Sequence, residues 1–230
     1  MRGVILAAGR GERLRPYTDY VPKPLLNLKG KPLIDHVIMT LRGAGVESII
    51  VVTGYMGDAV GRHLMRSHGQ EVTVVHNPGW VSGNANSLMA ARSHVTDGHF
   101  VLSMCDHIYS ESMVEDALAC YRGEPTLCVD REPLHLKDLD DATKVQVDRG
   151  GYIVAIGKGL TRWNAVDTGV FMLPATIFEA GDDSYRELSS LMGALCERGL
   201  LKAHDATGAQ WLDLDTVSDV EHAVEAATWI

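Results

Sequence analysis

The 230-residue sequence has neither a long apolar run nor a concentration of positive charge. No apolar stretch approaches the roughly 20 residues that a membrane-spanning helix needs. Lys and Arg total 21 against 30 Asp and Glu, so the formal net charge is −9. Nucleic acids and anionic membranes are bound through basic surfaces. The sequence therefore predicts a soluble protein with no nucleic-acid partner and no membrane insertion.

Cysteine and histidine patterns are also sparse. The four cysteines form no Cys-x-x-Cys pair and follow no regular spacing, which is typical of reduced core residues. The ten histidines contain no His-x-x-x-His pair, which argues against zinc. The first residues, MRGVILAAGR, reach a glycine-rich stretch too early for a signal peptide. We therefore expect a cytoplasmic protein.

Short apolar runs that alternate with segments of helical period predict βαβ units. The expected strands of the first half span 3–8, 48–53, 71–76, 99–104 and 126–129, and the expected helices span 31–44, 57–67, 85–94 and 111–121. The second half predicts strands at 143–147, 152–156, 166–173 and 200–203 and helices at 185–197 and 217–227, with a hairpin turn at Gly150-Gly151. The pattern indicates one α/β domain over residues 1–230, doubly wound and Rossmann-like, with a mixed, mainly parallel sheet.

A glycine-rich loop follows the first expected strand. It reads Leu6-Ala7-Ala8-Gly9-Arg10-Gly11-Glu12-Arg13-Leu14. Its glycines permit tight turns, its small alanines allow close backbone approach, and a cradle of N–H groups beside Arg13 suits a triphosphate. A dinucleotide fingerprint would need a glycine at Leu14, and a P-loop would need Gly-Lys-Ser/Thr. A merely structural turn stays open for this segment taken alone.

The next segment, Val21-Pro22-Lys23-Pro24-Leu25, encloses one lysine between two prolines. The prolines stiffen the backbone on both sides of Lys23. A lysine is a compact cation that can balance charge moving onto a leaving phosphate. A surface turn that carries a lysine is the alternative for this segment taken by itself.

Together these two motifs, Leu-x-Ala-Ala-Gly-x-Gly-x-Arg-Leu and Pro-Lys-Pro-Leu, resemble the signature of the nucleotidyltransferases that make sugar nucleotides and activated alcohols. The resemblance implies a single doubly wound domain. It implies that Leu6, Ala7, Ala8, Gly9 and Gly11 hold base and triphosphate. It also implies that Arg13, Lys23 and Asp106 act in catalysis and contact the nucleotide.

Such a family needs Mg²⁺, which prefers carboxylate and phosphate oxygens. Asp106 follows the apolar strand at 99–104, and Asp213 and Asp215 lie in Trp211-Leu212-Asp213-Leu214-Asp215-Thr216. Alternation along a strand would place the last two on one face. By resemblance, Asp106 and Asp213 match the family's metal positions and Asp215 is a third candidate, with helix capping as the alternative. For His107, a packing or supporting role and a catalytic role both stay open.

Further segments resemble, in chain order, the family members that use CTP and inositol-1-phosphate. They are Gly83-Asn84-Ala85-Asn86-Ser87-Leu88, Ser103–Ser110, Val129–Pro133, Ala142–Val145, Ile156–Lys158 and Val166–Phe171. The resemblance implies nucleotide contacts from Gly83, Asn84 and Ser87, although helix capping is an alternative for the last two. Residues 1–130 would bind the nucleotide and residues 131–230 the acceptor. The acceptor candidates are Lys144 and Lys158 for phosphate and Asp130, Arg131, Glu132 and Asp167 for hydroxyls; solvated charges and local ion pairs are the alternatives.

The expected reaction joins CTP to inositol-1-phosphate, giving CDP-inositol and pyrophosphate. In some relatives this domain is joined to a membrane-embedded alcohol phosphotransferase. Because the chain stops at Ile230 without a membrane segment, we expect a separate membrane enzyme to consume the product. A homodimer is compatible with the resemblance.

Other functions stay open at this point. The acceptor could be phosphocholine or aminoethylphosphonate, for which Tyr109, Trp163 and Trp211 could supply an aromatic box. It could also be a hexose-1-phosphate, because the insertion at residues 15–20 resembles the sugar-nucleotide branch. A catalytically silent nucleotide-sensing subunit is the alternative outside this chemistry.

Overall fold

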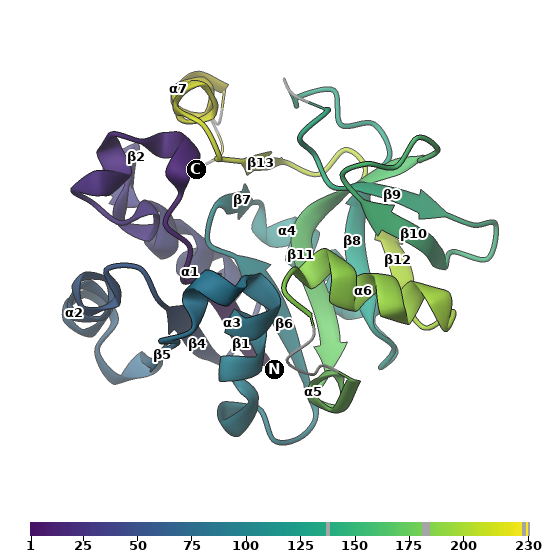
Figure 1. The fold of residues 1–230 in the computed structure, drawn as a ribbon, viewed down its shortest axis with the longest axis horizontal. Helices are drawn as coiled ribbons and strands as arrows, with labels where there is room; N and C mark the ends of the chain where they lie inside the picture. Colours follow the sequence, from purple (N-terminus) through teal and green to yellow (C-terminus); the bar gives the residue numbers. More distant parts are fainter. Residues whose placement is uncertain (137–138, 181–184, 227–228, 230) are drawn as a thin grey trace.

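The computed structural model describes residues 1–136, 139–180, 185–226 and 229. These residues form a nine-stranded sheet with helices packed against it (Figure 1). Its strands are β1 (Arg2–Ala7), β4 (Ser48–Thr53), β5 (Val72–His76), β6 (His99–Met104), β8 (Thr126–Asp130), β9 (Lys144–Val147), β10 (Ile153–Gly157), β11 (Ala165–Pro174) and β12 (Lys202–Asp205). Seven of them follow the order β10-β9-β11-β6-β1-β4-β5, while β8 pairs with β11 and β12.

The first half of the sheet is parallel, as predicted. Strand β1 pairs with β4 and β6, and β4 pairs with β5, all in parallel. Successive side chains of β1 point to opposite faces of the sheet. Ile5 and Ala7 belong to one buried apolar cluster, and Val4 and Leu6 belong to the other. Burial on both faces explains why this strand is a continuous apolar run.

Helices cover both faces, which confirms the doubly wound architecture. One face is covered by α1 (Leu33–Gly43), α2 (Gly57–His68) and α4 (Glu111–Cys120), and α7 (Val217–Ala226) adds Ala223 to the same buried cluster. The other is covered by α3 (Asn84–Ala90), α5 (Ile177–Ala180) and α6 (Leu188–Glu197), of which α3 and α6 lie in front of the sheet in Figure 1. Within the described ranges, no helix combines the length and apolar character needed to cross a membrane.

The second half of the sheet is mixed, which was also predicted. Strand β11 runs antiparallel to β6, β8 and β9, and β9 and β10 form an antiparallel pair across Gly150-Gly151. Gly151 has φ +81°, a left-handed value that glycine adopts without penalty. The hairpin prediction is therefore confirmed.

Two predicted helices differ from the structure by three or more residues at one end. The helix expected over 85–94 ends at Ala90, and a short 3₁₀ turn over Arg92–His94 follows. The helix expected over 185–197 begins only at Leu188. The preceding backbone is held by α3 instead, because Asn84 Oδ1 accepts the Leu188 N–H at 2.6 Å and Arg186 O accepts the Ala85 N–H at 3.1 Å. Residue 227, in the helix expected over 217–227, lies outside the described residues.

Two short antiparallel pairs escaped prediction: β2 (Asn27–Leu28) with β3 (Lys31–Pro32), and β7 (His107–Tyr109) with β13 (Trp211–Asp213). The second pair positions the site. It sets Asp213 opposite His107, and the Leu214 N–H donates to Asp106 O at 3.0 Å. Strand β13 ends at Asp213, so the expected alternation along one strand does not reach Asp215.

Candidate active site

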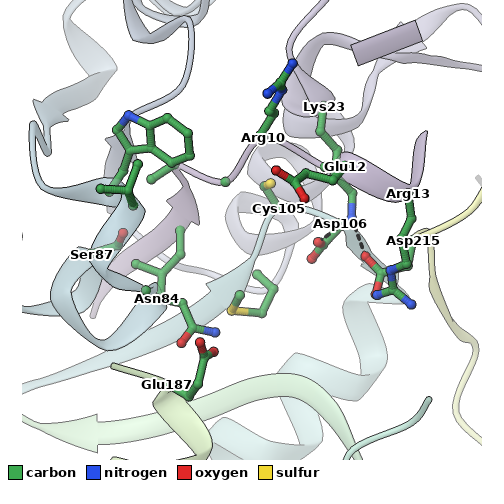
Figure 2. A pocket seen from close by; sticks show the side chains of 18 residues that line it. Arg10, Glu12, Arg13, Lys23, Asn84, Ser87, Cys105, Asp106, Glu187 and Asp215 are labelled. Atoms are coloured by element: carbon green, nitrogen blue, oxygen red, sulfur yellow. Dashed lines mark hydrogen bonds and ion pairs between the residues drawn. The ribbon is translucent and has the colours of Figure 1, made fainter. Parts of the chain in front are cut away.

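A cavity of about 510 Å³ opens where β1 and β6 end, beneath the loop that follows β1 (Figure 2). Ligands bind at this edge in open α/β sheets. Ten residues predicted to contact the nucleotide line it: Leu6, Ala8, Gly9, Gly11, Arg13, Lys23, Gly83, Asn84, Ser87 and Asp106. The eleventh, Ala7, lies instead in the apolar core below the loop.

Lys23 reaches this cavity because its side chain passes close to Gly11 of the glycine loop. Gly11 has φ +70°, and a Cβ atom there would lie 2.9 Å from Lys23 Cδ. Glycine is therefore required for two reasons: the backbone adopts a left-handed φ, and any side chain at this position would clash with the side chain of Lys23. Thr18 Oγ1 donates to Gly11 O at 2.9 Å, and Pro22 holds an extended backbone before the turn at Lys23.

The buried ammonium group of Lys23 donates to two carboxylates. Its Nζ lies 2.6 Å from Asp106 Oδ2 and 2.6 Å from Asp215 Oδ1. Burial disfavours the charged lysine, but the two carboxylates outweigh it and raise the pKa of Lys23. Burial also opposes ionisation of Asp106, but Lys23 and His107 outweigh it and lower the pKa of that carboxyl. Lys23 and Asp106 are thus both charged at neutral pH.

Arg13 links the same site to a further segment. Its guanidinium pairs with the carboxylates of Asp215 and Asp141. Lys158 Nζ lies 2.8 Å from the other oxygen of Asp141. Three of the four cations predicted to meet phosphate, Arg13, Lys23 and Lys158, are therefore each paired with carboxylates. A bound phosphate group would have to take the place of those carboxylates.

A second cavity of about 510 Å³ adjoins the first. The two share a wall made by Asn84, Met104, Asp106, Glu187 and Asp215. The second is also lined by Asp141, Thr143, Lys158, Asp167, Ser189, Trp211 and Asp213. Figure 2 shows Asn84 and Glu187 across the first cavity from Lys23 and Arg13. Two ligands could therefore meet beside Asp106, one in each cavity.

Asp213 completes a group of three carboxylates with Asp106 and Asp215. Its Oδ1 is buried and has no hydrogen-bond partner among the described residues. Burial, together with the carboxylates of Asp215 and Asp106, raises the pKa of Asp213 to about 6. A buried carboxylate oxygen without a donor is well suited to a hard cation, because Mg²⁺ prefers oxygen ligands. The residues present therefore fit a divalent metal.

His107 stands between two of these carboxylates. Its Nδ1 lies 3.0 Å from Asp106 Oδ1, and its Nε2 lies 3.9 Å from Asp213 Oδ2. Burial opposes protonation of the ring, but Asp213 and Asp106 outweigh it and raise the pKa of His107 to about 10. Gly169 makes room for the ring, since a Cβ there would lie 2.5 Å from His107 Cδ2. These contacts describe a side chain that orients both carboxylates.

The acceptor candidates divide into two groups. Lys158 and Asp167 line the second cavity, and burial raises the pKa of Asp167 to about 6. The other four, Asp130, Arg131, Glu132 and Lys144, are absent from the walls of both cavities in the part of the chain that is described.

Those four residues make contacts elsewhere. Asp130 is buried and accepts hydrogen bonds from Trp211 Nε1 at 2.9 Å and from the Glu132 N–H at 2.8 Å. Arg131 Nε lies 2.9 Å from Asp205 Oδ2. Lys144 is buried and donates to two backbone carbonyl groups. Each of these contacts supports local structure.

Sequence reasoning overlooked several residues that line the cavities, among them Glu12, Trp80, Glu187, Asp141 and Ser189. Glu12 is adjacent to predicted loop residues and could have been included. Glu187 and Asp141 lie in polar segments with no local signature. The three aromatic residues considered for a cationic acceptor do not form a box at the second cavity. Tyr109 is buried in the core and Trp163 packs on the core, whereas Trp211 does line the cavity.

The sequence model of the MobA-like NTP transferase domain matches residues 3–207. Two relatives, each named bifunctional IPC transferase and DIPP synthase, come from Aquifex aeolicus (35% identity) and Rubrobacter xylanophilus (37%). In each case the match covers 96% of this chain and 50% of the relative. The chain thus spans about half the length of these relatives. The solved inositol-1-phosphate CTP transferase from T. maritima superposes with a TM-score of 0.88 at 27% identity, covering 100% of this chain and 97% of that one. The chain therefore belongs to the MobA-like NTP transferase domain family of nucleotidyltransferases.

Proposed function

We propose that this chain transfers the cytidylyl group of CTP to inositol-1-phosphate with the help of Mg²⁺, giving CDP-inositol and pyrophosphate. The observation that carries the proposal is the meeting of two cavities at Asp106, one around the glycine loop and one beside Lys158. The similarity to a solved protein titled an inositol-1-phosphate CTP transferase, which this chain matches over its whole length, supports the choice of substrates.

The nucleotide is proposed to lie in the first cavity. The glycine loop and Arg13 would face its triphosphate, and Lys23 would contact phosphate. Asn84 and Ser87 lie near the start of α3, on the wall away from the loop. Their polar side chains would contact the base or ribose. Both already take part in hydrogen bonds within the protein: Asn84 Oδ1 accepts one from the Leu188 N–H, and Ser87 Oγ accepts one from Asn77 Nδ2 at 3.1 Å.

The acceptor is proposed to lie in the second cavity. Lys158 supplies a cation for its phosphate group. Asp167, Thr143 and Ser189 line the same space and offer acceptors and hydroxyl groups to a ring that carries several hydroxyls. This arrangement suits a polyol phosphate, because such a ligand needs a cation for its phosphate group and several hydrogen-bond partners for its hydroxyl groups.

In the proposed reaction, a phosphate oxygen of inositol-1-phosphate attacks the α-phosphorus of CTP. The bond from that phosphorus to the oxygen bridging to the β-phosphate breaks, and pyrophosphate leaves with the bonding electron pair. No protein nucleophile takes part, so the chain contributes positioning and charge neutralisation. Arg13 and Lys23 would leave their carboxylate partners for phosphate oxygens. Asp106, Asp213 and Asp215 would hold Mg²⁺, which when bound neutralises charge on the nucleotide and on pyrophosphate.

We also propose that the protein acts in the cytoplasm and that a membrane alcohol phosphotransferase consumes its product. The cytoplasmic location rests on the cysteine pattern, whereas the membrane enzyme and a homodimeric state rest on the family resemblance.

The test is pyrophosphate release with Mg²⁺, using CTP, UTP, GTP, ATP and dTTP against inositol-1-phosphate. Phosphocholine, aminoethylphosphonate and glucose-1-phosphate serve as competing acceptors. Release that requires both CTP and inositol-1-phosphate, with CDP-inositol identified by mass, would establish the proposal. Release with a different pair of nucleotide and acceptor would show that the proposed substrates are wrong. Nucleotide binding without release for any pair would favour a silent nucleotide sensor.

A further inference from the structure

A second group of metal-ligating side chains lies outside the active site, between α1 and α2. Asp35 lies in the first turn of α1, and His63 and His68 lie on α2. His63 Nε2 lies 2.9 Å from both carboxylate oxygens of Asp35, and His68 Nε2 lies 2.8 Å from its Oδ1. Each side chain thus offers one ligand atom, and these atoms all lie within 4.8 Å of one another.

We propose that Asp35, His63 and His68 form a binding site for a divalent transition-metal ion, with Zn²⁺ as the preferred ion. Two imidazole nitrogens and one carboxylate oxygen are a common set of protein ligands for Zn²⁺, with a water molecule in the fourth position. Mg²⁺ is a poor match, because it favours all-oxygen sites. The site is independent of the proposed cytidylyl transfer.

The distances require little movement to accept the ion. In tetrahedral coordination with bonds of about 2.0–2.1 Å, neighbouring ligand atoms are roughly 3.3 Å apart. The N···O separations in the protein are 2.8–2.9 Å. Each imidazole nitrogen therefore needs to move away from the carboxylate oxygen by roughly 0.5 Å, which side-chain rotation can supply while the helices stay in place.

Burial also favours a bound ion. The side chains of Asp35 and His68 are 14% and 9% exposed, which limits competition from water, whereas that of His63 is 24% exposed and leaves an entry path. Without metal, the two imidazoles can each donate an N–H to Asp35, so the same contacts also describe a hydrogen-bonded link between the helices. The experiment below separates the two descriptions.

The sequence gives no hint of this site, and its lack of a His-x-x-x-His pair argued against zinc. His63 and His68 are five positions apart, a spacing that turns two side chains away from each other in a regular helix. His68 is the last residue of α2, and its backbone at φ −124° departs from helical values. The third ligand comes from another helix, which no local motif can reveal.

The first test is calorimetric titration of metal-free protein with Zn²⁺ in excess Mg²⁺, which keeps the oxygen ligands of the active site occupied. Asp35→Asn, His63→Gln and His68→Gln are compared with His94→Gln, an exposed histidine outside both clusters. We expect one equivalent of Zn²⁺ in the wild type and in His94→Gln, with affinity reduced about tenfold or more in each ligand variant. An Asp106→Asn variant is titrated in parallel to report on the active-site carboxylates. Equal affinity in the first four variants, or a loss of affinity confined to Asp106→Asn, would overturn the proposal.

A second measurement uses only the wild-type protein, so its outcome does not depend on whether the variants fold. X-ray absorption at the zinc edge counts imidazole ligands in the Zn²⁺-loaded wild-type protein. Two imidazoles are expected at this site, whereas the cluster of Asp106, His107 and Asp213 contains only one. A spectrum with one imidazole or none would overturn the proposal, and so would an absence of bound Zn²⁺.

Discussion

The ammonium group of Lys23 lies 2.6 Å from a carboxylate oxygen of Asp106, although the two residues are 83 positions apart in the chain. The same ammonium group contacts Asp215. One buried cation thus joins the loop after β1, the end of β6 and the segment after β13. Its carboxylate partners are two of the three proposed Mg²⁺ ligands. Lys23 therefore balances negative charge that the proposed Mg²⁺ would also balance.

Replacing Lys23 with Met should lower turnover by about 10²–10³-fold, because a cation facing the phosphates is lost. Without Mg²⁺ the variant should also be less stable by about 3–5 kcal/mol, since Asp106 and Asp215 are left without their buried partner. Denaturant unfolding with and without Mg²⁺ measures this, and Mg²⁺ should restore part of the loss. Lys31→Met, at an exposed position, should change neither quantity. Near-normal turnover in the Lys23 variant would remove its assigned role.

Asp106→Asn should reduce turnover by about 10²–10³-fold, because Asp106 lines both cavities and is the carboxylate that joins Lys23 to His107. Asp213→Asn should shift the Mg²⁺ dependence of activity to higher concentrations, because Asp213 contributes the buried oxygen that lacks a donor. Activity is measured across a Mg²⁺ titration. Asp116→Asn, on the exposed face of α4, is the matched control. An unchanged Mg²⁺ dependence for Asp213→Asn would rule it out as a ligand.

The elements fixed by local patterns were predictable. Strands β4 and β6 have the predicted bounds, since each is an apolar run enclosed by polar residues. The start of α6 was not, because the residues before it are recruited by Asn84, about 100 positions away. A hydrogen bond of this kind depends on the assembled fold and leaves no trace in local composition.

The site also contains residues that local sequence predicts and residues that it does not. The glycine loop and Lys23 were found because close backbone approach demands particular residue types. The segment at Asp130 looked equally polar, yet its carboxylate is buried against the indole of Trp211, a partner 81 positions away. Conversely, Asp141 and Glu187 reach the cavities from segments with no pattern of their own. Polar residue type alone therefore does not separate a ligand contact from an internal one.

Lys144 and Lys158, the two lysines that the sequence predicted to bind the acceptor phosphate, provide a direct comparison. Lys158→Ala should raise KM for inositol-1-phosphate by about 10–100-fold through loss of one charged hydrogen bond, with little change in KM for CTP. Lys144→Ala should instead lower the free energy of unfolding by about 1–3 kcal/mol, because it removes a buried donor to the carbonyls of Asp140 and Lys158. Steady-state kinetics and urea unfolding of both variants measure these effects. An equal rise in acceptor KM for both lysines would contradict the distinction.

Two glycines test how the wall between the cavities is built. Gly83 has φ +110°, and a Cβ atom there would clash with the carbonyl oxygen of Arg186, which also accepts the Ala85 N–H. Gly83→Ala should therefore push α3 away from the chain that carries Glu187. We expect a loss of about 2 kcal/mol or more in unfolding free energy and a raised KM for CTP. Gly61→Ala in α2 is the control, because its Cβ would meet Val74 Cγ1 at an ordinary 3.7 Å. That change should stabilise the protein by about 0.5–1 kcal/mol through helix propensity. If the two variants unfold at the same denaturant concentration, the close approach at Gly83 does not hold the two segments together.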